Sequence, residues 1–387
     1  MARQSRKLWT DARNVQLADL WSQQKTRADL VRILSADGPP VTEKQVVAQV
    51  AKLRRKGIIV DGATDSRTPR RSVKPPKLPL TLPGVYQGIA NSAYHGMLCS
   101  TPSLSASGSV VIEKKNAKIF WHGSYLNRGK VRKESREFDM GSAAHYAILE
   151  PDILAERVMV INAPNYQSGR AQAGRAHARS LGRVPLLGHQ FETIQSMRAA
   201  IKAHPFASQA FIGGIAEQTL AWRDPKTGIW LKCRPDYALL DWSEVSDLKT
   251  TYNVHPEALI YKGWQDGWYM RAAWYLDGIH KVTGIRPQVF WFVCIEVEPP
   301  HCITVVYYEL EALDFGAECN RRSIDIFDRG LSEGYWPEYA EKPEVLRLPF
   351  KAEGQLDQRK AAGDFRVGPT PELFRKAMKF QEPVMRG

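Results

Sequence analysis

Two carboxylates and a lysine occupy positions where a buried sheet would normally carry apolar residues. In the segment 234–251, RPDYALLDWSEVSDLKTT, Asp236 precedes a short apolar stretch, and Asp247 and Lys249 lie within the next one. Because side chains alternate between the faces of a strand, Asp247 and Lys249 project side by side. Carboxylate oxygens suit Mg²⁺ and Mn²⁺, and a lysine can orient a water and offset anionic charge. This spacing indicates metal-dependent phosphodiester chemistry, while an exposed ion pair is the ordinary origin of an isolated Asp-x-Lys.

Strand-like segments surround this pattern. The segments 214–222 and 228–240 have strand composition, and RDPKTG joins them as a turn with proline and glycine in place. Together with 244–251 they predict a meander of three strands, with Glu217 on the first strand and Asp236 near the end of the second. Upstream, MGSAAHYAILEP predicts a helix that carries His145 and packs closely through the small residues Gly141, Ala143 and Ala144.

The ordered segments resemble the nuclease signature of the PD-(D/E)xK superfamily, here with a literal Pro-Asp at Pro235 and Asp236. The helix around His145 resembles the Gly-x-x-x-His helix of RecB-type and RecE-type nucleases. LPGVYQGIANSAYHGMLCSTPSLSAS (82–107) resembles the entry segment of RecE-like exonucleases, and GYWPEY (334–339) resembles their closing segment. The similarity covers residues 82–340 and leaves out both ends of the chain.

The resemblance to RecE-like exonucleases implies a role for each residue of the pattern. Lys249 would serve the attacking water, and Glu217 would hold a second ion through water, with a surface glutamate as the alternative. The expected cofactor is Mg²⁺, for which Mn²⁺ substitutes, with one or two ions per site. The expected ligands of the metal are His145, Asp236, Asp247 and the backbone carbonyl of Leu248.

The helix after the lysine strand departs from the family pattern, which has Gln-x-x-x-Tyr there. Arg271 takes the glutamine position, and Tyr275 follows one turn later, so both are expected on one face in contact with DNA phosphate. A second register, Gln265 with Tyr269, fits the sequence of the helix less well. Arginine at this position predicts either stronger phosphate binding or altered activity.

The positive charge of the chain is concentrated at its front. The net charge is +13, and residues 1–80 carry 17 Lys/Arg against 7 Asp/Glu. Such a basic segment indicates a polyanionic partner. Residues 1–60 read as three short helices forming a basic helix-turn-helix-like module, and Pro-rich residues 61–80 read as a linker.

The third of these helices is expected to bind DNA. Thr42 and Gln45 form a capping-box pattern at its start. Val46, Val47, Val50 and Leu53 would be its buried stripe, and in the first helix Val15, Leu17, Leu20 and Trp21 would be buried. The outward residues would be Lys44, Gln45, Gln49, Lys52, Arg54 and Arg55, of which we expect Lys52, Arg54 and Arg55 to bind DNA. A plain helical bundle or a protein-contact surface is the alternative.

The expected fold class is α/β: a PD-(D/E)xK restriction-endonuclease-like core, with a central mixed sheet flanked by helices, plus a small all-α N-terminal domain. The nuclease domain would span 81–340, and 341–387 would be a tail. No apolar run approaches the roughly 20 residues that span a membrane. Five scattered cysteines without a CxxC pair favour reduced thiols in a cytoplasm, bacterial or of a phage-infected host.

The resemblance implies an exonuclease that degrades one strand of linear duplex DNA from an end, leaving a single-stranded overhang for recombination. It also implies double-stranded DNA ends, a single-strand annealing protein and other copies in a ring as partners. The alternatives are an endonuclease or single-strand trimming nuclease of the same fold, or a catalytically decayed protein that binds DNA through its helix-turn-helix.

Overall fold

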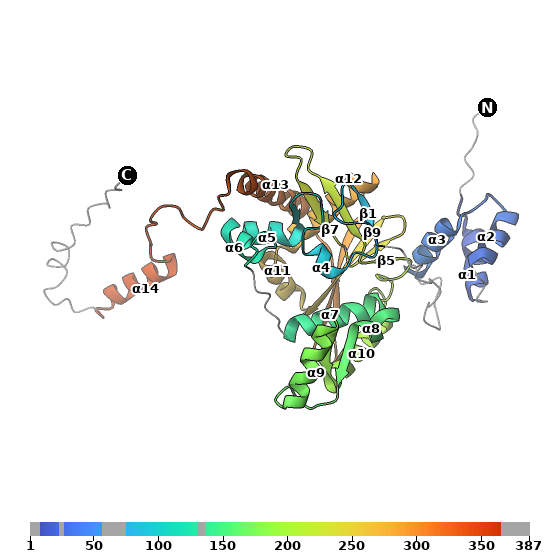
Figure 1. The fold of residues 1–387 in the computed structure, drawn as a ribbon, viewed down its shortest axis with the longest axis horizontal. Coiled ribbons are helices and arrows are strands. Elements are labelled where there is room, and N and C mark those ends of the chain that lie inside the picture. Colours follow the sequence, from blue (N-terminus) through green and yellow to red (C-terminus); the bar gives the residue numbers. More distant parts are fainter. Residues whose placement is uncertain (1–7, 23–26, 56–74, 130–135, 365–387) are drawn as a thin grey trace. The chain divides into compact units, whose positions relative to one another are not determined.

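The computed structural model describes residues 8–22, 27–55, 75–129 and 136–364 (Figure 1). The chain divides into two compact units between Tyr339 and Ala340. In the described residues, no helix is both long and apolar enough to cross a membrane.

Three helices precede the nuclease-like region: α1 (Asp11–Ser22), α2 (Arg27–Ala36) and α3 (Glu43–Arg55). The predicted capping box is confirmed, because the Thr42 N–H donates to Gln45 Oε1 at 2.9 Å and the Gln45 N–H donates to Thr42 Oγ1 at 3.3 Å. The core of these helices comprises Leu17, Leu30, Leu34, Val41, Val46, Val50 and Leu53.

Two details of the helical module differ from the sequence-based expectation. Val15 is 65% exposed and takes no part in the core. Gln49 is buried instead of facing outward, since its amide donates to Asn14 Oδ1 at 2.6 Å and so joins α3 to α1. Arg13, by contrast, is buried, and its guanidinium donates to the carbonyl of Leu8 at 2.9 Å and to those of Leu34 and Pro39.

The strands of the following region form two larger sheets and one small one. The five-stranded sheet has the order β11-β10-β9-β8-β5, and the four-stranded sheet has the order β1-β6-β7-β2. The first comprises β5 (Gly214–Ala216), β8 (Tyr237–Leu239), β9 (Glu244–Thr251), β10 (Val289–Glu296) and β11 (Ile303–Val306); the second comprises β1 (Gly84–Tyr86), β2 (Ser103–Ser105), β6 (Thr219–Arg223) and β7 (Trp230–Cys233). β3 (Val158–Ile161) pairs with β4 (Val184–Leu187).

The predicted three-strand meander is wrong in its topology. Each of the first two predicted strands breaks, so that β5 pairs with β8 and β8 pairs with β9 in one sheet, while β6 and β7 lie in the other. The breaks fall at Glu217, which has a φ of 55°, and at Pro235, which has no N–H to donate to a ladder. The Glu217 N–H donates to the Asp236 carbonyl at 3.1 Å, which ties the two breaks together.

Helices cover both faces of the five-stranded sheet, which makes a three-layer α/β core. On one face, Leu248, Val293 and Ile295 pack with α7 (Arg136–Leu149) and α10 (Gly188–Ala203). On the other, Val245 and Phe292 pack with α11 (Pro256–Gln265), α12 (Trp268–Thr283) and α13 (Leu310–Glu333). Figure 1 shows α7 to α10 below the sheet and α12 and α13 above it. The expected fold class, a mixed sheet flanked by helices, is confirmed.

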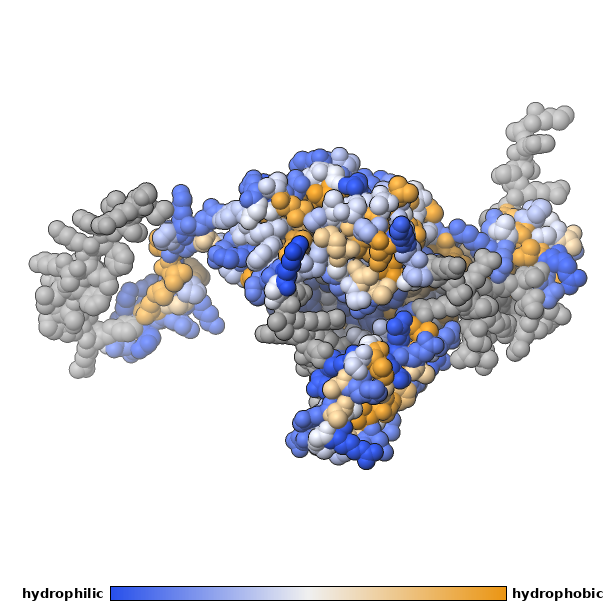
Figure 2. Space-filling model, viewed as in Figure 1, coloured by the Kyte–Doolittle hydropathy of each residue, from blue (hydrophilic) through white to orange (hydrophobic). Residues whose placement is uncertain are grey.

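The remaining helices are short, except α9. They are α4 (Asn91–Tyr94), α5 (Ala106–Lys114), α6 (Ala117–Gly123), the 3₁₀ turn Pro151–Ile153, α8 (Leu154–Arg157) and α9 (Gly169–Ser180). In the second compact unit, α14 (Phe350–Ala361) has no buried residue. On the visible face, Figure 2 shows polar surface interrupted by smaller apolar areas.

Candidate metal centre

His145 enters the centre from α7, where small side chains let the helix approach the sheet. Ala143, Ala144 and Ala147 are fully buried. A side chain added at Gly141 would come within 3.9 Å of Thr250 on β9. Nδ1 of His145 lies 3.6 Å from Asp236 Oδ2 and 3.9 Å from Glu217 Oε1. The predicted helix is thus confirmed, and it brings an imidazole to two carboxylates.

Glu217 and Asp236 reach the histidine because the chain breaks at both positions. Asp236 is 8% exposed, and its Oδ2 accepts a hydrogen bond from the Leu248 N–H at 2.7 Å. This bond fixes the carboxylate against β9. The ligand atoms of His145, Glu217 and Asp236 all lie within 4.8 Å of one another. Two carboxylate oxygens and one imidazole nitrogen are a donor set that suits a divalent cation such as Mg²⁺ or Mn²⁺.

Asp247 and Lys249 form an ion pair next to this group. They lie on β9, as the alternation predicted, and Lys249 Nζ pairs with Asp247 Oδ2. Asp247 is 2% exposed, so its charge requires a partner, and the ammonium supplies one. The three-residue group above does not include Asp247. Leu248 has a buried side chain, and its N–H is the backbone group that contacts Asp236.

Burial and neighbouring charges shift the ionisation of the two cations. Burial lowers the pKa of Lys249 to about 8, although Asp236 acts in the opposite direction. An ammonium with this pKa exchanges a proton near neutral pH more readily than an exposed lysine. Burial also lowers the pKa of His145, but the charges of Asp236 and Glu217 outweigh it, so the net shift of the pKa is upward. The protonated imidazole is thus favoured by the same carboxylates that favour a metal cation.

Arg234 is a residue of this centre that the sequence-based prediction missed. Its Nε donates to Thr219 Oγ1 at 2.9 Å and its Nη2 donates to the Ile89 carbonyl at 3.1 Å, while the guanidinium lies over the Tyr94 ring at 4.2 Å. Burial lowers its pKa, and Tyr94 and Glu217 oppose the shift. Its position in the sequence could have indicated this role, because a charged residue directly before Pro235 and Asp236 stands where the end of a buried strand is usually apolar.

Arg271 and Tyr275 both lie on α12, and the alternative register is excluded. Gln265 ends α11 whereas Tyr269 belongs to α12, and Gly267 with a φ of 65° separates the two helices. Arg271 Nη1 donates to Ser107 Oγ at 3.1 Å, and its buried Nε has no hydrogen-bond partner among the described residues. Tyr275 is 6% exposed and packs edge-on against Phe290. Arg271 is therefore the more accessible of the two for a phosphate.

The aromatic residues between 261 and 291 separate into two groups. Trp268, Tyr269, Trp274, Tyr275 and Phe290 are buried, as expected of core residues, while Tyr261 and Trp264 are exposed. On α3, Lys52 is exposed, whereas the side chains of Arg54 and Arg55 lie outside the described residues.

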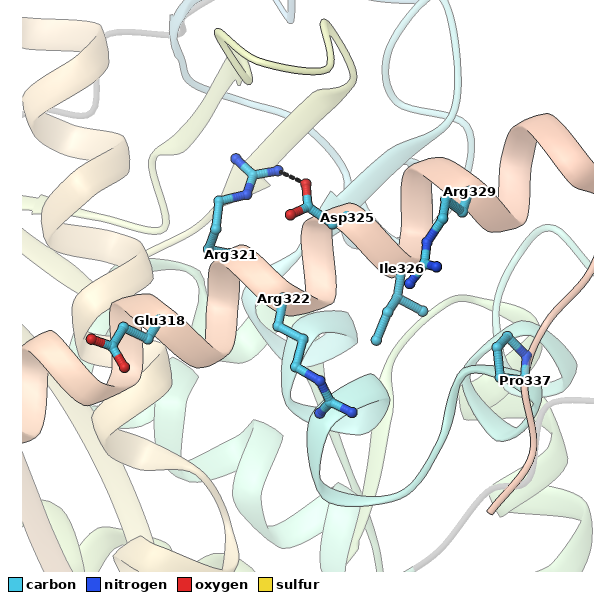
Figure 3. A pocket seen from close by; sticks show the side chains of 7 residues that line it. All are labelled: Glu318, Arg321, Arg322, Asp325, Ile326, Arg329 and Pro337. Carbon is cyan, nitrogen blue, oxygen red and sulfur yellow. Dashed lines mark hydrogen bonds and ion pairs between the residues drawn. The ribbon is translucent and has the colours of Figure 1, made fainter. Parts of the chain in front are cut away.

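A hollow of about 590 Å³ lies elsewhere, on the outer face of α13 (Figure 3). Its charged groups are largely paired: Arg321 with Asp325 at 2.8 Å and Arg322 with Glu113 at 2.7 Å. Arg321 also contacts Asp224 at 2.7 Å. The hollow is therefore a surface of ion pairs. The residues that could bind a metal lie elsewhere, at the chain breaks around Glu217 and Pro235.

Comparison with known proteins identifies the domain that contains this centre. A family model described as "PDDEXK-like domain of unknown function" matches residues 122–349, a range that includes His145, Glu217, Asp236, Asp247 and Lys249. No curated protein matches the chain.

Two solved structures are also similar in part. One, described as "Putative exonuclease" from Eubacterium rectale, has 12% identity and a TM-score of 0.47, covering 69% of this chain and 98% of its own. The other, SSO0001, has 12% identity and a TM-score of 0.24, covering 50% of this chain and 88% of its own.

Proposed function

The chain belongs to the family of PDDEXK-like domains of unknown function, within the PD-(D/E)xK nuclease superfamily, and we propose that it is a metal-dependent deoxyribonuclease acting on DNA ends. The observation that carries the proposal is the convergence of His145, Glu217 and Asp236 beside the Asp247–Lys249 pair. A partly buried lysine paired with a buried carboxylate contributes little to apolar packing, whereas phosphodiester hydrolysis uses both kinds of group.

We assign the metal ligands by combining the geometry with the family pattern. His145, Asp236, Asp247 and the Leu248 carbonyl would hold a first Mg²⁺ or Mn²⁺, and Glu217 would hold a second through water. Such an ion supplies charge neutralisation at the scissile phosphate and activation of the attacking water. Asp247 would exchange its ammonium partner for the ion, which leaves Lys249 for the water.

The remaining cationic side chains have separate tasks in this proposal. Lys249 would orient the water and, in the neutral amine form that burial favours by bringing its pKa to about 8, would take up the proton of the water as the oxygen–phosphorus bond forms and the bond to the leaving oxygen breaks. Arg271 would hold a neighbouring phosphate through its terminal guanidinium nitrogens, of which Nη1 bonds Ser107. Arg234 supports the Asp236 turn from behind through its bonds to Thr219 and Ile89.

We further propose a RecE-like action, the degradation of one strand of linear duplex DNA from an end. Its support is the sequence similarity over residues 82–340. The overhang would serve a single-strand annealing protein in recombination, in the cytoplasm of a bacterium or a phage-infected cell, and a ring of copies would enclose the DNA. The N-terminal helices, linked by residues 61–80, would add contacts to DNA through Lys52, Arg54 and Arg55.

The experiment compares linear duplex DNA with covalently closed circular duplex DNA, each incubated with Mg²⁺. We expect wild type to degrade the linear form alone and Asp247→Ala to degrade neither. Asp152→Ala, which removes an exposed carboxylate from the 3₁₀ turn, is the matched control and should behave as wild type. Cleavage of the circle would assign an endonuclease at the same site. Binding without cleavage, with Mg²⁺ and with Mn²⁺, would assign a DNA-binding protein.

A further inference from the structure

A stack of aromatic rings lies where α11 meets α12. Trp264, near the end of α11, is nearly parallel to Tyr269 of α12, with ring centroids 5.4 Å apart. Phe315 of α13 is nearly parallel to both, at 6.2 Å from Trp264 and 5.7 Å from Tyr269. Tyr269 is buried, whereas Trp264 is 53% exposed and Phe315 is 46% exposed. The corner thus presents large apolar rings to solvent on a buried aromatic base.

One broad face of Trp264 is free of the other rings. If Trp264 lay between Tyr269 and Phe315, the centroids of Tyr269 and Phe315 would be much farther apart than the 5.4 Å and 6.2 Å that separate each of them from Trp264. They are 5.7 Å apart, close to the other two spacings, so no ring lies between the others. The exposed half of Trp264 is therefore a flat apolar plate, of the kind on which another planar ring stacks.

A lysine supplies positive charge over one face of the Trp264 ring and leaves the other face open. Lys114 Nζ, at the end of α5, lies 3.5 Å from the Trp264 centroid and 5.2 Å from that of Tyr269. Among the described residues no carboxylate forms an ion pair with Lys114, and the adjacent Glu113 is held by Arg322 at 2.7 Å. An ammonium fixed over aromatic rings and not neutralised by a carboxylate is suited to an external anion.

The plate is connected to the candidate metal centre through α5 and α12. At the start of α5, Ser107 bonds Arg271, which lies close enough to Lys249 to affect the pKa of its ammonium. Ser107 and Lys114 are seven residues apart on one helix, a distance of about 10 Å at 1.5 Å per residue. Stacked nucleotides rise about 3.4 Å each, so about three of them span the interval along α5 from Ser107 to Lys114.

We propose that Trp264, flanked by Phe315 and Lys114, is a stacking site for an unpaired DNA nucleotide beside the cleavage centre, an inference that rests on the proposed nuclease function. Every base offers a flat face to an indole, so such a site is independent of sequence, and Lys114 pairs with the adjoining phosphate. A base within a duplex has no free face, so the site selects an unpaired strand.

The test measures binding of full-length protein to DNA in EDTA, so that it does not depend on cleavage. Three labelled substrates share one duplex: a blunt end, a four-nucleotide thymidine overhang, and an overhang of abasic residues. For Trp264→Ala we expect binding to the thymidine overhang to weaken on the order of tenfold, and binding to the blunt and abasic substrates to stay unchanged. Trp264→Phe, which keeps a stacking ring, should restore most of the affinity.

Tyr261→Ala is the matched control, because Tyr261 is 71% exposed on the same helix but belongs to none of the stacked pairs above. Its binding should equal that of wild type on all three substrates. If Trp264→Ala weakened DNA binding equally on all three substrates, or on none of them, the proposal would be overturned. A change in oligomeric mass, measured by light scattering, with unchanged DNA binding would also overturn it, because it would mark a protein contact. Wild type that shows the Trp264-dependent preference but never cleaves would instead reject the nuclease function alone.

Discussion

The side chain of Asp236 is hydrogen-bonded to β9, the strand that carries Lys249. One carboxylate oxygen, Oδ2, accepts from the Leu248 N–H at 2.7 Å and lies 3.6 Å from His145 Nδ1. The position of this oxygen is therefore set by the backbone of β9. A hydrogen bond from a backbone N–H to a buried carboxylate is among the stronger contacts available, so the group is preorganised before DNA binds.

Lys232 is a second lysine that is shielded from water in this part of the protein. It is 3% exposed, donates to the Tyr94 carbonyl at 2.7 Å, and lies near the Tyr94 and Tyr125 rings. Burial lowers its pKa to about 8, so the unfolded chain binds this proton more tightly than the folded one. Below pH 8 the folded protein bears the full cost of the buried charge, and the cost is relieved as the pH rises toward 10.5.

We predict that the stability difference between wild type and Lys232→Met changes with pH. From pH 8 to 9.5 wild type should gain about 2 kcal/mol relative to the variant, because only wild type loses the buried proton. The carbonyls left without a donor cost the variant the same at every pH. Urea denaturation at several pH values measures the difference, and a pH-independent difference would show that Lys232 titrates as in the unfolded chain.

The two chain breaks are the decisive feature at the element scale. They convert two predicted strands into four, place these in two sheets, and bring Glu217 and Asp236 face to face. The sequence could not show this, because both halves of each segment have the same strand composition. Glutamate is also a poor candidate for a φ of 55°, so Glu217 gave no local signal of a break. Pro235 is the one visible sign of a break, and it also forms the Pro-Asp pair of the nuclease-like motif.

Close packing between α12 and α13 depends on Gly316. A Cβ at this position would lie 2.6 Å from the Tyr269 carbonyl oxygen, and a backbone atom cannot move aside. Gly316→Ala should therefore destabilise the fold by about 1–3 kcal/mol. Gly169→Ala, at the start of α9 with nothing within 4 Å of the added Cβ, is the control and should not destabilise it. Thermal unfolding of both variants tests this, and equal midpoints would contradict the packing.

The whole molecule combines a family domain with a strongly basic front. The three-layer core over the matched range follows the expectation from the sequence, because the ordered motifs depend on short segments that the sequence shows directly. The helix that carries His145 and the strand that carries Asp247 and Lys249 were also predicted correctly. The contacts of Arg234 with Thr219, Ile89 and Tyr94 depend on distant segments, which no local pattern reveals.

The basic front should make DNA affinity depend steeply on salt. Replacing Lys52, Arg54 and Arg55 with alanine in the full chain should reduce the slope of log affinity against log salt by up to about 2.7, at roughly 0.9 per lost phosphate contact. Cleavage at low salt should persist, since these residues lie outside the metal centre. Replacing three exposed basic residues outside the N-terminal segment, Lys202, Lys281 and Arg286, with alanine removes the same charge and is the control. An unchanged slope in the triple variant would favour a protein partner for the N-terminal helices.

The most direct measurement is the release of nucleotides from end-labelled linear duplex DNA by wild type, Asp236→Asn and the exposed-site control Asp152→Asn, in Mg²⁺ and in EDTA. Wild type and Asp152→Asn should degrade the DNA in Mg²⁺ and not in EDTA. Asp236→Asn, which keeps the shape but loses the charge, should be slower by at least about 100-fold. Full activity of Asp236→Asn, or activity of wild type in EDTA, would contradict a metal-dependent nuclease centre at this position.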